Sequence, residues 1–238
     1  MRGPVLADPI DTAQSHFPLR PARPVMQPLS HPTHPTSPAG RLAPLPGRDP
    51  QGMLRRALHD WGGKSDLWVF AYASLIWRPD FAVTEQRLAR VHGWHRALKM
   101  WSRVNRGTPE VPGLVFALLS GGSCHGAVLR VPRADGEAVL HRLWEREMVT
   151  GVYDPKWLHC DTARKPVLAL TFTLSRRSPN FTGNLGEQQY RDIFARSSGR
   201  YGTTLDYARK TLQCLQEHGI HDPALVRLLA HAGDPAST

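Results

Sequence analysis

The chain has 238 residues, of which 41% are hydrophobic and 21% are charged. That length fits one domain with a substantial core and a small appendage, rather than two large domains. The composition is typical of a soluble globular protein, and the absence of any run of roughly 18 apolar residues excludes a membrane-spanning one. The net charge of +10 makes nucleic acid, anionic membranes and acidic small molecules candidate partners without choosing among them.

Prolines divide the chain into two regions, because twelve of the 21 lie within residues 1–50. Proline fixes φ and lacks an N–H donor, so neither helix nor sheet can extend through such a segment. We predict a disordered or polyproline-like arm over residues 1–50 and a folded domain over residues 51–238. Residues 18–24, PLRPARP, are similar to ligands of aromatic-lined grooves, although an extension with no partner is the favoured interpretation. The arm holds five Arg and three Asp, or +2, so +8 of the net charge belongs to the domain.

Structure is predicted to begin with a short helix from Gly52, followed by a series of strands. Leu54, Leu58 and Trp61 share one helical face, and the two glycines after Trp61 are a typical stop. Continuous apolar and aromatic runs then indicate strands, with turns at RVNRGTPEVPG and at SGGS. These strands are expected at residues 67–73, 87–101, 113–119 and 125–131.

The second half of the domain is predicted to be mixed and then helical. Residues 135–150 form a helix with Asp135 as its N-cap, and strands follow at 152–162 and 165–175. The later strand alternates apolar positions at Leu168, Leu170, Phe172 and Leu174. Helices are expected at 186–198, 203–219 and 221–233, the last with an Asp222 cap before Pro223. Strands followed by helices, without regular βαβ alternation, indicate an α+β fold.

Cysteine usage favours a reducing compartment. Cys124, Cys160 and Cys214 are too few and too scattered for a disulfide framework, and no CxxC pair suggests a structural metal. We interpret all three as inert core residues. The first residues of the chain include acids and prolines and lack the apolar segment of a signal peptide. A cytoplasmic protein is therefore expected.

Two segments could carry chemistry. In AYASLIW, residues 71–77, small side chains leave backbone N–H groups uncovered where a buried strand ends, and such groups can hold a carboxylate or an oxyanion. A strand end packed with small residues is the alternative. In the helix before residue 150, Glu147 lies one turn after Leu143 on the apolar side, whereas Glu145 and Arg146 are expected to point away. Burial would raise the pKa of Glu147 toward neutrality, as a general acid/base requires, although a partly exposed Glu is equally compatible.

Three separated motifs together resemble the ChaC-type γ-glutamylcyclotransferase family. They are VFAYASLIWRPDF, WEREMVTGVY and GRYGTTLDYARKTL, and the resemblance covers about residues 66–217. It implies a γ-glutamylcyclotransferase-like mixed β-barrel with an inserted helix and C-terminal helices, and cleavage of glutathione to 5-oxoproline and cysteinylglycine. It also implies Glu147 as the catalytic carboxylate; the substrate-binding residues would be Tyr72, Ala73, Ser74, Leu75 and Tyr207, with Tyr153 a weaker addition. No metal or organic cofactor is implied, and no nucleophilic Ser or Cys is needed.

Two departures from the family pattern leave alternatives open. Ala71 and Ala73 replace glycines, and the methyl group at Ala73 would matter if that position required φ > 0. A catalytically silent binding or regulatory protein on the same scaffold is therefore a second hypothesis. A cyclotransferase for other γ-glutamyl peptides or amines is also compatible with the motifs.

A basic run in the second predicted strand suggests a different class of partner. His95, Arg96, Lys99, Arg103 and Arg106 interleave with tryptophans, as in single-strand nucleic-acid platforms, but a solvated strand face is the favoured interpretation. Arg103 or Arg106 could instead attract anionic glutathione toward the pocket. We expect a small-molecule substrate, with neither a nucleic-acid nor a membrane partner, and the sequence leaves the oligomeric state open.

Overall fold

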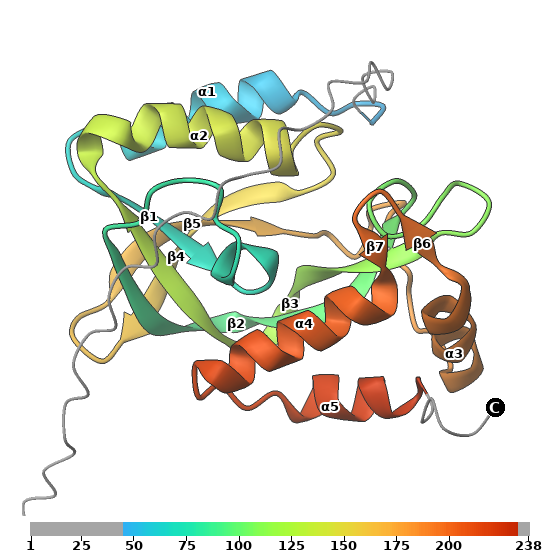
Figure 1. Ribbon diagram of the computed structural model, residues 1–238. Coiled ribbons are helices and arrows are strands. Elements are labelled where there is room, and N and C mark those ends of the chain that lie inside the picture. The colour runs from blue at the N-terminus through green and yellow to red at the C-terminus, as the bar shows by residue number, and fades with distance from the viewer. Residues whose placement is uncertain (1–44, 233–238) are drawn as a thin grey trace, which may run out of the picture. The chain divides into compact units, whose positions relative to one another are not determined.

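A five-stranded closed barrel forms the centre of the domain in the computed structural model, which describes residues 45–232 (Figure 1). The strand order is β1-β3-β2-β4-β5, and parallel pairings of β5 with β1 and β3 close the barrel. The strands are β1 (Leu67–Ala71), β2 (Glu85–Ser102), β3 (Gly113–Val131), β4 (Asp154–Thr162) and β5 (Val167–Thr173). Together with five helices within these residues, the barrel confirms the predicted α+β class.

The predicted turn at SGGS is wrong, because β3 runs unbroken from Gly113 to Val131. Gly121 and Gly122, both at positive φ, lie opposite the single residue Gly93 of β2, where the pairing register shifts. Such a bulge needs residues that tolerate positive φ, and this is why glycines occur in the middle of a strand. Pairs of glycines occur both in turns and in β-bulges, so the sequence alone led to the prediction of a turn where the structure has a bulge.

The alternation predicted for the last long strand is also wrong. In β5, Ala169, Leu170, Thr171 and Phe172 are all buried, and Leu168 is 49% exposed. One face of β5 lines the barrel and the other is covered, since the Trp144 ring contacts that of Phe172 edge-on at 5.6 Å. A strand buried on both faces reads as a continuous apolar run rather than as an alternating one.

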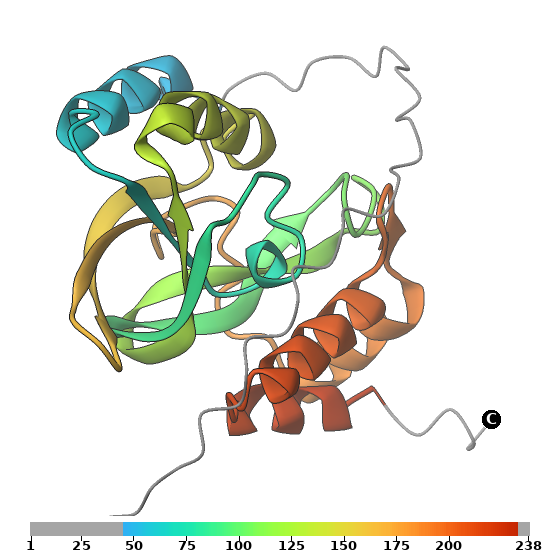
Figure 2. The same cartoon turned by 60° about the vertical axis from the view of Figure 1, so that its left-hand side comes forward.

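Helices cover the barrel on two sides (Figures 1 and 2). On one side α1 (Pro50–Trp61) lies beside α2 (Arg133–Glu147), and a Cβ at Gly136 would come within 2.4 Å of Trp61. On the other side are α3 (Glu187–Arg196), α4 (Thr204–Glu217) and α5 (Pro223–Ala230). The hairpin of β6 (Ser198–Gly199) and β7 (Gly202–Thr203) precedes α4.

Helix ends test three sequence predictions. The stop of α1 is confirmed, since Gly62 adopts the left-handed conformation at φ 67°. The cap of α5 is also confirmed, because the Asp222 side chain accepts from Leu225 N. Asp135 is not the N-cap of α2, which begins earlier, at Arg133 after Pro132. The N–H of Arg133 at this end donates to Asp66 Oδ1 at 2.8 Å, so a carboxylate from outside the helix takes the place of a capping side chain at Asp135.

The segment just before α1 packs on the domain. Leu45 N donates to Thr150 O at 2.9 Å, and Arg48 donates to Tyr153 O and to the Asp154 carboxylate. Contacts of the domain therefore extend at least to Leu45, although the boundary at residue 50 stays a prediction. Residues 1–44, including PLRPARP, lie outside the described residues.

The three cysteines are buried and free, as predicted, and burial raises the pKa of the Cys160 thiol to about 12. Among the described helices, none is long and apolar enough to cross a membrane. Within residues 45–232, no group of three or more His, Cys, Asp and Glu side chains is arranged to hold a metal ion.

Candidate active site

The loop that leaves β1 carries four of the predicted site residues. After Ala71 the chain passes through Tyr72 and Ala73 into the short 3₁₀ helix η1 (Ser74–Ile76), which lies between α2 and α4 (Figures 1 and 2). Ala73 has φ −147°, so its methyl group causes none of the strain of the left-handed region. An alanine at position 73 therefore does not require the positive φ that would favour glycine.

Three consecutive N–H groups in this loop are unpaired. Ile76 N donates to Ala73 O at 2.9 Å, which makes Ala73 the cap of η1. The N–H groups of Ala73, Ser74 and Leu75 have no acceptor among the described residues. Free N–H groups at the start of a helical turn can stabilise negative charge. The loop therefore offers the kind of donors that the sequence suggested.

Glu147 is the last residue of α2, and its side chain is 19% exposed. The predicted inward orientation is confirmed. Burial raises the pKa of the Glu147 carboxyl, and the Arg146 guanidinium, with Nε 2.9 Å from Oε1, acts in the opposite direction. A carboxyl group with an elevated pKa can take up and return a proton near neutral pH.

Arg146 was expected to point away from the core, and this prediction is wrong. Its side chain is 21% exposed and donates to Ser74 Oγ at 3.0 Å, to the Asp80 carboxylate and to a backbone carbonyl. Arg146 thus links the end of α2 to the loop after β1. Arg142, one turn earlier on α2, also donates to Asp80, so the segment after β1 covers this face of the helix, and helical periodicity alone does not predict that cover.

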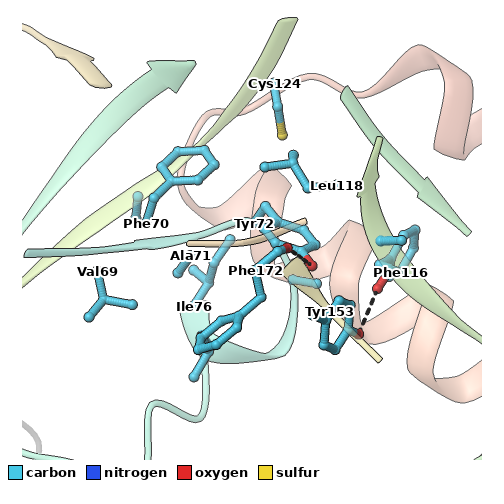
Figure 3. Packing of buried hydrophobic residues seen from close by; sticks show 14 of the residues in the cluster. Val69, Phe70, Ala71, Tyr72, Ile76, Phe116, Leu118, Cys124, Tyr153 and Phe172 are labelled. Atoms are coloured by element: carbon cyan, nitrogen blue, oxygen red, sulfur yellow. Dashed lines mark hydrogen bonds between the residues drawn. The ribbon is translucent and has the colours of Figure 1, made fainter. Parts of the chain in front are cut away.

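Three buried tyrosines interact electrostatically with this carboxylate. Tyr72 donates to Phe172 O at 3.0 Å, and Tyr153 lies 3.5 Å from Phe116 O (Figure 3). Burial raises the pKa of all three tyrosine hydroxyls, that of Tyr207 to about 12, and the charge of Glu147 adds to each shift. Tyr72, Tyr153 and Tyr207 are therefore within electrostatic reach of Glu147, although they come from different parts of the chain.

The predicted basic strand face does not exist as one surface. Arg96 has a side chain only 4% exposed, pairs with Asp222 at 2.8 Å and donates to Tyr72 O at 2.7 Å. The Arg106 guanidinium lies over the Tyr207 ring, 4.6 Å from its centroid. Lys99 and Arg103 make exposed contacts with Asn184 and Asn180.

Two irregularities of β2 flank Arg96. The pairing of β2 with β3 shifts between His92 and Trp94 and again between Ala97 and Met100. The buried residues of β2 are accordingly Ala89 and Val91, at odd numbers, before the two shifts, and Leu98 and Met100, at even numbers, near the second one. A shift of one residue moves each following side chain to the opposite face, so simple alternation does not orient Arg96, and sequence reasoning missed its burial.

A separate cleft of about 530 Å³ lies elsewhere and contains none of these residues. Trp61, Trp68 and Trp157 line it together with Arg87 and Arg130. The site described here is thus defined by its buried polar groups and not by this cleft.

Comparison with known proteins places this geometry in context. The family model described as "ChaC-like protein" matches residues 67–234. The glutathione-specific γ-glutamylcyclotransferase of Escherichia coli is 35% identical over 164 residues, which are 68% of this chain and 71% of that protein. Glutathione-specific γ-glutamylcyclotransferase 1 of Rattus norvegicus is 29% identical over 75% of this chain and 82% of its own length. A solved yeast γ-glutamyl cyclotransferase specific to glutathione shares the fold, with a TM-score of 0.63 and 22% identity over 71% of this chain and 98% of its own.

Proposed function

The chain belongs to the ChaC-like family, and from this premise we propose that it is a γ-glutamylcyclotransferase that converts glutathione to 5-oxoproline and cysteinylglycine. One observation carries the proposal: the carboxylate of Glu147 is largely buried, has a raised pKa and is joined through Arg146 to Ser74, in a loop with free N–H groups. A partly desolvated carboxylate next to hydrogen-bond donors suits proton transfer coupled to attack on a carbonyl.

The reaction begins with the substrate's own amine. A γ-glutamyl α-amine has a pKa of about 8, so it is mostly protonated at neutral pH and cannot attack. Glu147 accepts one proton, and the freed nitrogen attacks the γ-carbonyl carbon of the same molecule. Both reacting groups belong to one substrate, so holding the glutamyl chain in a curled conformation supplies the required proximity. No covalent enzyme intermediate forms.

Collapse of the tetrahedral intermediate completes the cycle. The N–H groups of Ala73, Ser74 and Leu75 are the donors that would meet the developing oxyanion. The bond from the γ-carbon to the cysteine nitrogen then breaks as Glu147 returns its proton to the departing amine. The ring nitrogen, which still carries two protons after its attack, gives one of them to Glu147, and Glu147 passes it to the released amine, so cysteinylglycine leaves as an ammonium ion and the carboxylate is regenerated. The products are the five-membered lactam, 5-oxoproline, and cysteinylglycine.

The tyrosines and Arg146 have supporting roles in this proposal. Tyr72, Tyr153 and Tyr207 keep their protons at neutral pH, because burial raises their pKa values. They bound a pocket that excludes water from the reacting amine. Arg146 positions the Glu147 carboxylate and ties it to the substrate loop through Ser74.

A silent binding protein on this scaffold is the competing hypothesis. Its motivation was the pair of alanines in place of glycines, and the φ of −147° at Ala73 weakens that motivation. The two hypotheses differ in turnover. We expect purified protein to release equal amounts of 5-oxoproline and cysteinylglycine from glutathione. Binding of glutathione without either product would favour the silent protein.

A comparison of several γ-glutamyl compounds tests which substrate the enzyme prefers. Glutathione, γ-glutamylcysteine, γ-glutamylalanine and a γ-glutamyl amine should be compared by the rate of 5-oxoproline release. We expect glutathione to give the highest kcat/KM. If one of the other compounds gave a higher kcat/KM, the preferred substrate would belong to that class instead of being glutathione. The proposed cyclisation reaction would be unaffected.

The cellular compartment of the protein and its other partners are also part of the proposal. Three buried free thiols fit a cytoplasmic protein. Arg96 is held in an internal ion pair and Arg106 lies on the Tyr207 ring, so few cations of β2 and of the connection after it are left for a nucleic-acid strand. We therefore propose a cytoplasmic enzyme that acts on a small molecule without a nucleic-acid partner.

A further inference from the structure

Arg106 is a partly buried cation at the edge of the proposed active site. It lies in the connection between β2 and β3, with its guanidinium 4.6 Å from the centroid of the Tyr207 ring and one nitrogen donating to Tyr201 O. In residues 45–232 no carboxylate pairs with it within 4.0 Å. Asp206 attracts it and Arg78 repels it, both from a greater distance. A desolvated cation without a paired anion is unfavourable in a free protein.

The backbone around Arg106 is held rigidly. Arg106 N donates to Ser102 Oγ at 3.0 Å, and the adjoining residues accept from the hairpin of β6 and β7. Tyr201 N donates to Asn105 O at 3.0 Å. Glycine is required at the closest approaches, because a Cβ at Gly107 or Gly199 would come within 2.5 Å of a backbone nitrogen. The guanidinium is therefore preorganised, a condition that lowers the entropic cost of binding.

Tyr207 connects this cation to the proposed base. The Tyr207 ring lies 4.6 Å from the Arg106 guanidinium and, between centroids, 6.1 Å from the ring of Trp77, which ends η1. Arg146 bonds both to Glu147 and to Ser74 at the start of η1, so Tyr207 packs between the cation and the short helix that Arg146 ties to the base. A substrate whose amine approaches Glu147 would extend past Tyr207 toward Arg106.

Glutathione has two carboxylates, and their positions differ. The α-carboxylate shares a carbon with the reacting amine, so it must bind close to Glu147. The glycine carboxylate is at the other end of the tripeptide, up to about 10 Å away when the chain is extended. A guanidinium presents a planar fork of donors that matches a carboxylate. Arg106 carries such a guanidinium and does not belong to the group of side chains that bond to Glu147.

We propose that Arg106 binds the glycine carboxylate of glutathione and thereby makes the enzyme prefer γ-glutamyl tripeptides that end in a free carboxylate. This inference rests on the proposed function. It assigns Arg106 a role in substrate specificity and none in proton transfer.

The test compares two substrates that differ only at the glycine end. They are glutathione and its glycinamide, in which a neutral amide replaces the carboxylate. The variants are Arg106→Gln, which removes the charge, and Arg106→Lys, which keeps it without the fork. Arg103→Gln is the matched control, because Arg103 lies in the same connection but is exposed and donates to Asn180. Thermal unfolding of each variant reports whether the domain still folds.

We expect Arg106→Gln to lower kcat/KM for glutathione by roughly 10- to 100-fold through KM, the usual effect of losing a charge-assisted hydrogen bond. For the glycinamide we expect a change of at most about twofold on the same grounds. Arg106→Lys should retain part of the preference, and Arg103→Gln should resemble the wild type. Equal losses on both substrates, or an equal effect of Arg103→Gln, would overturn the inference while leaving the function intact. If the wild type released 5-oxoproline from neither substrate, the proposed function would fail as well.

Discussion

The pairing of Arg146 with Glu147 sets the ionisation of the proposed base. Burial raises the pKa of Glu147, and Arg146 lowers it through its charge and its hydrogen bond. Glu147 must be ionised to accept a proton, so kcat/KM falls as pH drops through its pKa. Replacing Arg146 by Gln removes the lowering influence and leaves burial unopposed. We expect the acid limb of the kcat/KM profile to move to higher pH and activity near pH 7 to decrease.

The control for this change is Arg142→Gln. Arg142 lies on the same helix and donates to Asp80 O at 2.9 Å, but it does not bond to Glu147. Its replacement should leave the pH profile in place. An acid limb that stays fixed or moves to lower pH in Arg146→Gln would contradict the positioning role of Arg146.

Ala73 gives a second test at the scale of single residues. Its φ of −147° is negative, so alanine at this position does not require the left-handed region that favours glycine. Ala73→Gly should leave kcat/KM within about threefold and lower the free energy of unfolding by about 0.5–1 kcal/mol, because glycine adds freedom to the unfolded chain. Urea unfolding and a glutathione assay measure the two quantities. A large gain in activity would mean that the alanine impairs the oxyanion-binding loop.

At the scale of elements, the pair of Arg96 and Asp222 joins β2 to the start of α5. Arg96 is almost fully buried, and it also donates to the backbone of Tyr72 in the site. Asp222 accepts from Leu225 N as the cap of α5. Asp222→Ala leaves a buried guanidinium without its carboxylate, a change that typically costs about 3–5 kcal/mol. We expect a corresponding drop in the free energy of unfolding, measured with urea.

Asp222→Asn separates the two roles of this side chain. Asparagine is as good a cap as aspartate but lacks the charge, so this variant should be more stable than Asp222→Ala by about 1 kcal/mol. If Asp222→Ala cost less than about 1 kcal/mol, α5 would not depend on the ion pair.

Elements with strong local signals could be predicted from the sequence, and those set by strand register could not. The helix stop at Gly62 and the Asp222 cap follow from residues that are adjacent in sequence. The bulge opposite Gly93 depends on which residues β3 places across from it, and this pairing is not visible in β2 alone. The inward direction of Arg96 and its bond to Tyr72 were missed for that reason.

At the scale of the whole molecule, the barrel brings together residues that are far apart in sequence. Tyr72, Glu147, Tyr153 and Tyr207 converge because β1, α2, β4 and α4 begin or end near the same place. The three motifs that resemble the γ-glutamylcyclotransferase family pointed to these residues, and helical periodicity predicted that Glu147 faces inward. The supporting contacts of Arg146 and Arg106 emerge only when the loop after β1 and the hairpin before α4 are assembled.

The most direct test of the account is the activity of Glu147→Gln beside that of Glu145→Gln, an exposed glutamate on the same helix. With glutathione as substrate and 5-oxoproline as the measured product, Glu147→Gln should lose about 10²- to 10⁴-fold in kcat, the usual contribution of a general acid/base. Its thermal unfolding should stay close to that of the wild type, and Glu145→Gln should remain fully active. A folded Glu147→Gln protein that releases 5-oxoproline at the wild-type rate would contradict the assignment of Glu147 as the base.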